Sequence, residues 1–108
     1  MAKPTAPAAP PAAPADLSLP MKFLWREVVE VHELEPHRLR LLQLMCQAWD
    51  RGEQARVAIA KHGITYPDRF GAPRLRPEVA VERDCRLTFA RILRDLDLRT
   101  PSPLWPGL

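Results

Sequence analysis

One apolar seam of helical spacing runs through the middle of this chain and restricts its fold more than any other feature of the sequence. Its members recur every three or four residues, which is typical of one face of an α-helix. Pro36 can open this helix because its missing N–H falls among the free donors of a first turn, and Gly63 can end it. We therefore predict a long helix from about Pro36 to His62, with a seam formed by Leu41, Leu42, Met45, Ala48, Trp49, Gly52, Ala55 and Ile59.

Gly52 lies inside this seam, where a glycine costs about 1 kcal/mol relative to alanine. Because glycine carries no side chain, a neighbouring helix can approach closely at this point. We therefore predict a close helix crossing at Gly52. Trp49 shares the same seam, and Trp25 lies on the apolar stripe of an earlier segment, so we expect both indoles to be core anchors rather than base-stacking platforms.

Two further segments show the helical period. The first begins near Ser18 to Pro20, where Ser18 can cap, and should run to about Leu34, with an acidic face opposite its apolar stripe. The second begins at Pro77 and should run to about Asp97. Its outer face alternates arginines with acids, which is typical of a solvated, salt-bridged surface formed by Arg83, Arg86, Arg91, Arg94, Glu82, Asp84 and Asp95.

The helical period disappears between Ile64 and Arg76, where glycines and prolines supply turn chemistry and predict a loop or a short hairpin. The predicted fold class is therefore all-α, with three amphipathic helices: a helical hairpin plus a third helix, joined by this connector. Residues 20–98 should form one helical domain. The Ala/Pro-rich segment 1–19 and the Pro-rich segment 99–108, which contains Trp105, are expected to be disordered tails unable to build a core.

Several function classes find no support in the sequence. We expect Cys46 and Cys85 to be buried thiols in a reducing cytoplasm, because both lie in apolar helical patterns. No apolar run is long enough for a membrane span or a signal peptide. Neither a zinc-ligand spacing nor a phosphate loop nor a nucleophile turn occurs, so we expect no metal, no cofactor and no catalytic residues.

The formal net charge of +3 favours an anionic partner only mildly. More informative is the use of arginine, which binds phosphate and guanine with two parallel hydrogen bonds, since the only lysines are Lys3, Lys22 and Lys61. A GC-rich genome is an alternative explanation for the same arginine excess. The densest local positive charge lies in the connector, where Arg69, Arg74 and Arg76 face one acid, Asp68.

The order of several sequence blocks resembles the small subunit of tailed-phage terminases over roughly residues 20–98. The blocks are L-W-R-E-V-V at 24–29, A-W-D-R at 48–51, H-G-I-T-Y-P-D-R-F-G-A-P-R at 62–74, R-P-E-V-A-V-E-R-D-C-R at 76–86 and L-R-D-L-D-L at 93–98. Family members often carry a histidine where this chain has Arg76. The resemblance implies a non-catalytic helical protein that forms a homo-oligomeric ring, recognises double-stranded viral DNA near the packaging start, and brings it to the large terminase subunit.

The connector and the start of the last helix supply the candidate DNA-binding residues Lys61, Arg69, Arg74, Arg76, Arg83 and Arg86. Alternatively, some of these arginines pair with acids within the fold or across a ring interface. Two other functions remain open. One is a transcriptional regulator that uses the turn at Leu34 to Arg38 in a helix-turn-helix, and the other is a DNA-free interaction scaffold.

Overall fold

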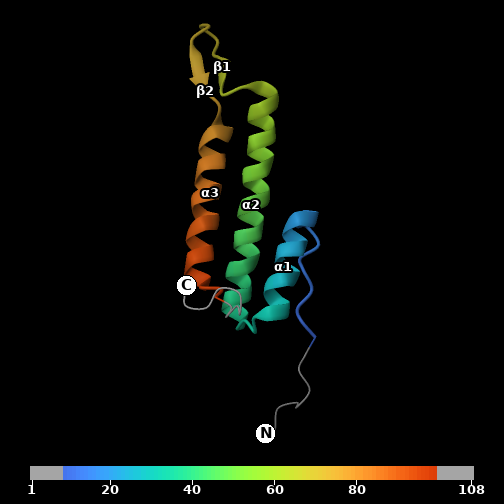
Figure 1. Ribbon diagram of the computed structural model, residues 1–108. Coiled ribbons are helices and arrows are strands. Elements are labelled where there is room, and N and C mark those ends of the chain that lie inside the picture. The colour runs from blue at the N-terminus through green and yellow to red at the C-terminus, as the bar shows by residue number, and fades with distance from the viewer. Residues whose placement is uncertain (1–8, 100–108) are drawn as a thin grey trace, which may run out of the picture.

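A computed structural model describes residues 9–99 as three helices and one two-stranded antiparallel ribbon. The helices are α1 (Leu19–Val31), α2 (Pro36–His62) and α3 (Pro77–Leu96). The strands β1 (Thr65–Pro67) and β2 (Pro73–Leu75) join α2 to α3. α2 and α3 run side by side as an antiparallel pair, the ribbon projects from one end of that pair, and α1 lies beside the half of α2 that is far from the ribbon (Figure 1).

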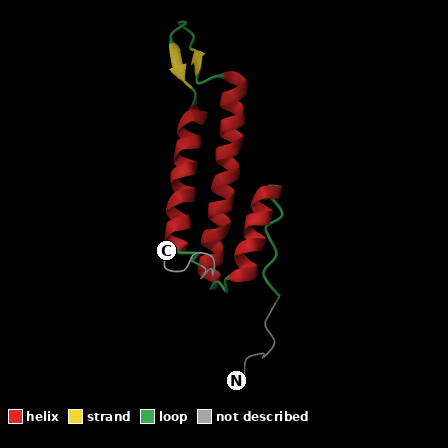
Figure 2. Cartoon of the chain, in the orientation of Figure 1, coloured by secondary structure: helices red, strands yellow, loops and turns green. Residues whose placement is uncertain are grey.

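The predicted bounds of α2 are confirmed, and α3 begins at Pro77 as expected. α1 ends at Val31, three residues before the predicted Leu34, because His32 is already extended and Glu35 is held extended by the following Pro36. The three predicted helices and the short-hairpin alternative for the connector are confirmed, but the all-α class is confirmed only in part. The connector forms a small sheet, so the chain is mostly helical rather than plainly all-α (Figure 2).

The close helix crossing predicted at Gly52 is present. A Cβ atom added to Gly52 would lie 3.3 Å from the Cβ of Cys85 on α3, which is tighter than ordinary van der Waals contact. Ala48 and Ala55, one turn away on either side, are also buried. Small side chains therefore bring the two long helices together in the half of the pair that α1 does not cover.

The hydrophobic core lies at the end of the molecule opposite the ribbon. It joins α1, the first half of α2 and the last two turns of α3, and its buried members are Leu17, Met21, Trp25, Val28, Val29, Leu42, Met45, Cys46, Ile92 and Leu96. The guanidinium of Arg38 donates to the carbonyl of Leu96, which ties the end of α3 to the start of α2. The core therefore fixes the base of the rod, and the ribbon end depends on the helix pair alone.

The expectation that residues 1–19 contribute nothing to the core is wrong for the part described, residues 9–18. Leu17 is buried in the core, Ala13 packs against it, and the Trp25 indole donates to the carbonyl of Pro11 at 2.9 Å. Ser18 caps α1 as predicted and is itself held by Asp50, whose carboxylate accepts from its backbone N–H and its hydroxyl. The expectation for the C-terminal tail, including Trp105, falls outside the described residues.

Candidate nucleic-acid interface

Asp68 organises the tip of the ribbon. One oxygen of its carboxylate accepts from the backbone N–H groups of Phe70 and Ala72, at 2.8 and 2.9 Å. The other accepts from the Arg74 guanidinium at 3.0 Å. Gly71 adopts a positive φ of 78°, which this turn requires and which glycine adopts without steric cost. These three hydrogen bonds and the conformation of Gly71 fix the turn that carries Arg69 and Phe70.

The pKa of the Asp68 carboxyl is held below its ordinary value, first by the hydrogen bond from Arg74 and then by the two backbone N–H groups. A lowered pKa in the folded state means that the charged carboxylate stabilises the turn above the ordinary carboxyl pKa, and that this contribution is lost as the pH falls through the lowered value. The turn therefore keeps its charged form throughout the neutral range.

Four of the six predicted site residues gather at the ribbon end. Arg69 lies in the turn and is exposed, with its guanidinium 4.8 Å from the centre of the Phe70 ring. Arg74 is paired with Asp68, although most of its side chain remains exposed. Lys61 is exposed in the last turn of α2. Arg76 precedes α3 and is partly buried, with its guanidinium 5.9 Å from the centre of the Tyr66 ring.

The other two predicted residues, Arg83 and Arg86, lie further along α3 and form ion pairs on that helix. The Arg86 guanidinium is 2.7 Å from Glu82, and that of Arg83 is 3.3 Å from Asp84. Because both pairs are on the surface, they contribute little to stability and do not prevent the arginines from binding another anion. The alternative of pairing within the fold therefore describes Arg74, Arg83 and Arg86 but not Arg69.

Sequence reasoning missed one exposed aromatic side chain and predicted ion pairs that two exposed arginines do not form. Phe70 stands beside Arg69 in the turn, and its position among turn residues, outside every apolar stripe, was the signal available. Arg91 and Arg94 were assigned to a salt-bridged surface, but within residues 9–99 neither forms an ion pair. They leave positive charge on the outer face of α3.

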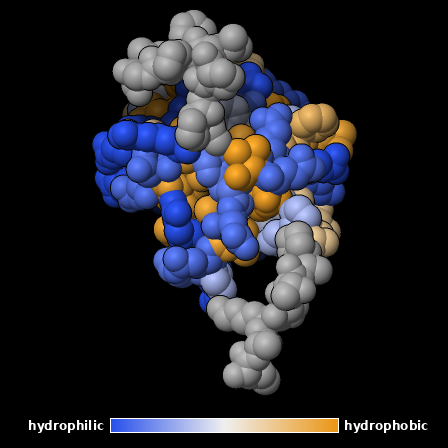
Figure 3. Space-filling view, turned by 60° about the horizontal axis from the view of Figure 1, so that its bottom comes forward, coloured by the Kyte–Doolittle hydropathy of each residue, from blue (hydrophilic) through white to orange (hydrophobic). Residues whose placement is uncertain are grey.

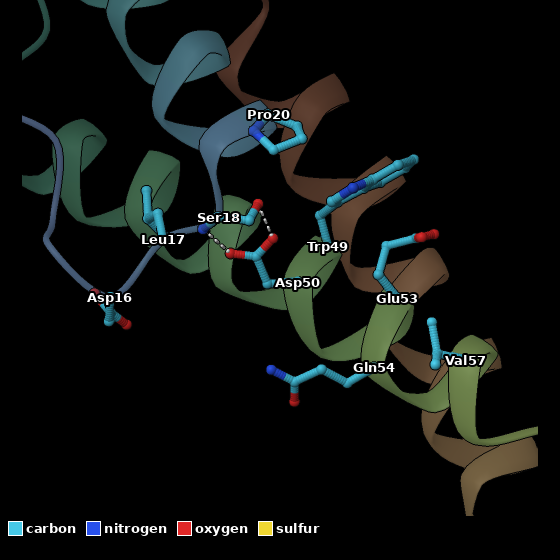
Figure 4. Close-up of a pocket in the computed structure, with 9 residues that line it drawn as sticks. All are labelled: Asp16, Leu17, Ser18, Pro20, Trp49, Asp50, Glu53, Gln54 and Val57. Atoms are coloured by element: carbon cyan, nitrogen blue, oxygen red, sulfur yellow. Dashed lines mark hydrogen bonds between the residues drawn. The ribbon is translucent and has the colours of Figure 1, made fainter.

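A second surface feature is a groove of about 800 Å³ where the start of α1 meets the middle of α2. Trp49 stands on one wall of this groove, and Asp16, Asp50 and Glu53 make its lining acidic (Figure 4). The prediction that Trp49 is a buried anchor is therefore wrong, since its side chain is 38% exposed and contacts Phe89 at one edge of the core. The same prediction is confirmed for Trp25.

The cysteines differ from each other. Cys46 is buried as predicted, and burial, assisted by the charge of Asp50, raises its pKa to about 11. Cys85 is only half-buried, because it lies at the crossing with Gly52 rather than in the core. Between residues 9 and 99, no group of three or more His, Cys, Asp or Glu side chains could hold a metal ion.

The helix-turn-helix alternative is not favoured by the position of α2. α1 and α3 both pack against this helix, and its first half supplies the centre of the core. A reading helix needs one free face along which several side chains can reach base edges.

In the described part of the chain, no helix is both long and apolar enough to cross a bilayer.

Comparison with known families assigns most of the chain. A family model described as "Phage terminase, small subunit" matches residues 22–102, which include α2, the ribbon, α3 and all of α1 except its first three residues. Among curated proteins, and among solved structures, no significant match was found.

Proposed function

This chain belongs to the phage terminase small subunit family, and from that premise we propose that it binds duplex viral DNA at the packaging start and delivers it to the large terminase subunit. The proposal that the chain binds DNA is supported by the concentration of positive charge at the ribbon end of the molecule. Lys61, Arg69, Arg74 and Arg76 lie at one end of the rod, and the carboxylate of the local acid, Asp68, is occupied by the turn. Positive charge therefore exceeds negative charge at an exposed end.

Duplex binding measured at several salt concentrations tests this proposal. Alanine at a residue that contacts a phosphate should lower the slope of log K against log salt by about 0.9, because fewer counterions are released. Arg69→Ala is the cleanest change, since Arg69 forms no ion pair within residues 9–99. Arg40→Ala is the matched control, because Arg40 is an exposed arginine near the start of α2, at the far end of the rod.

Unchanged slopes for alanine variants of all four ribbon-end residues would contradict the assignment of this surface. Failure of the unmodified protein to bind any duplex at low salt, while it still binds a partner protein, would instead select the DNA-free scaffold. Specific binding of a dimer to a palindrome would select the regulator.

We further propose that the chain forms a homo-oligomeric ring. Apolar side chains remain exposed on α1 and on the first half of α2, including Leu19, Phe23 and Leu44, and the view with the lower end turned forward shows apolar patches between hydrophilic ones (Figure 3). The acidic groove beside Trp49 and the unpaired Arg91 and Arg94 are different, complementary surfaces. A contact between different surfaces propagates from copy to copy and closes when the rotation allows it.

Light scattering on the purified chain tests the ring. We expect one discrete species at a whole multiple of the chain mass of 12.3 kDa, and Val57→Lys at the rim of the groove, which places a positive charge opposite Arg91 and Arg94 of the next copy, should shift it toward the monomer. Val57 is more than half exposed, so the folded chain tolerates this change. A strict monomer at high protein concentration would rule the ring out.

The remaining parts of the proposal follow from the family. The ATPase and nuclease activities are assigned to the large subunit, this chain acts as its non-catalytic DNA-recognition and regulatory partner, and both work in the cytoplasm of the bacterial host.

A further inference from the structure

The most exposed aromatic side chain of the described residues lies at the end of the molecule far from its core. Phe70 is 79% exposed at the tip of the ribbon. Fully exposing a phenylalanine forgoes roughly 1.5–3 kcal/mol that burial would provide. A small domain with a modest core gains nothing from such a residue there, so its position points to contact with something outside the chain.

The exposure of Phe70 is enforced by the turn. Its backbone N–H donates to Asp68, the N–H of Gly71 donates to the Asp68 carbonyl at 2.9 Å, and Gly71 reverses the chain directly after it. These bonds fix the backbone of the turn and so hold Phe70 at the tip of the ribbon, away from the helices (Figure 1). The Arg69 guanidinium, 4.8 Å from the ring centre, places a positive charge beside the apolar tip.

The two strands that lead to Phe70 form a narrow ribbon that is exposed on both faces. Every residue of β1 and β2 is exposed, so neither face of the ribbon is covered by the rest of the fold. Pro67 pairs with Pro73 at the tip end of the ladder, where proline offers no N–H for pairing with another strand. These features disfavour sheet extension and leave a narrow cationic arm with an apolar end.

We propose that this arm enters the minor groove of duplex DNA and that Phe70 wedges between two base pairs and kinks the duplex. The proposal rests on the DNA-binding function proposed above and names the way in which that site grips its ligand. Proteins that bind the minor groove combine cationic side chains with an apolar wedge, and the unstacking they cause bends the DNA onto more protein surface. Arg69, beside the wedge, would then lie over the neighbouring phosphates, and Lys61 and Arg76 would follow the backbone toward the helices.

Charge favours DNA over an apolar pocket on another protein. Arg69 lies in the turn itself, Arg74 lies on β2 where it pairs with Asp68, and Lys61 and Arg76 lie at the helix end of the ribbon. A protein pocket that accepts a phenylalanine needs no such row of cations along the ribbon, whereas a nucleic acid presents phosphates on both sides of its groove.

The test compares Phe70→Ala with Leu75→Ala. Leu75 is an apolar residue of the same ribbon and is 60% exposed, but it lies at the end nearer the helices. The probe is a short duplex with 2-aminopurine beside flexible TA steps and a fluorophore pair at its ends, at low salt. The unmodified protein should raise the 2-aminopurine fluorescence and shorten the end-to-end distance, because an unstacked base is no longer quenched and the duplex is bent.

Phe70→Ala should abolish both signals and weaken binding by roughly tenfold, comparable with the loss of one aromatic–base stacking contact. The salt slope should not change, because no cation is removed. Leu75→Ala should leave both signals intact. Asp68→Ala gives a further check, since it adds net positive charge yet should reduce the kink by loosening the turn.

Duplex that is bound and kinked equally by Phe70→Ala and the unmodified protein would overturn the wedge while leaving the DNA-binding function intact. No binding by any variant would instead overturn the DNA-binding function itself. Normal DNA binding by Phe70→Ala combined with lost binding of the large subunit would assign Phe70 to a protein pocket and so also overturn the wedge.

Discussion

Replacing Leu42 by alanine is expected to lower the free energy of unfolding by about 2–5 kcal/mol. Leu42 is 0% exposed and belongs to the core that joins α1, α2 and α3. Truncation removes buried methyl and methylene groups and leaves a cavity that the surrounding helices fill only in part. For a small domain whose total stability is about 5–15 kcal/mol, this loss is a large share.

Leu87→Ala is the matched control, because Leu87 is a leucine of α3 that is 58% exposed. Its unfolding free energy should change by less than about 1 kcal/mol. Both variants are measured by chemical denaturation at one protein concentration, so that any self-association contributes equally. Equal destabilisation by the two changes would mean that the core is not where the structure places it.

The long helices were predictable because their signals are local. Pro36, Pro77 and Gly63 mark helix boundaries through the backbone geometry of proline and glycine alone, and the bounds of α2 follow from them. The crossing at Gly52 was predictable for a similar reason, since an interior glycine in an apolar seam needs a compensating close contact.

The base of the molecule was less predictable because it depends on contacts between distant segments. Nothing in an Ala/Pro-rich stretch indicates that the Pro11 carbonyl will accept a hydrogen bond from Trp25, or that Leu17 will enter the core. The exposure of Trp49 has a related cause. A helical seam shows which residues share a face, but it does not show that α1 begins level with Asp50 and therefore leaves Trp49 at the edge of the core.

In the candidate site, the sequence predicted where the positive charge is concentrated but not which arginine forms an ion pair. The excess of arginine between residues 69 and 76 is visible in composition, whereas the engagement of Arg74 by Asp68 depends on the turn that brings them together. Phe70 was missed because periodicity finds residues that a fold buries, and the turn holds this side chain away from the fold.

The second large effect is expected at the helix crossing, where Gly52→Leu should lower the free energy of unfolding by about 1–3 kcal/mol. The leucine would project into the Cys85 side chain, whose Cβ lies 3.3 Å from the position of an added Cβ. α2 and α3 must then separate in the half of the rod that lacks support from α1. Because the ribbon is attached to both helices, this separation should also weaken duplex binding.

Gly52→Ala separates the two physical effects at this position. Alanine gains about 1 kcal/mol of helix propensity over glycine, and its single methyl group requires a shift of only a few tenths of an ångström against Cys85, so its net effect should be small. Ala60→Leu adds the same leucine side chain at an exposed position of α2 and should change stability little. If Gly52→Leu were as stable as these two variants in thermal and chemical unfolding, the close approach would carry no packing constraint. The ribbon would then be held by something other than the α2–α3 pair.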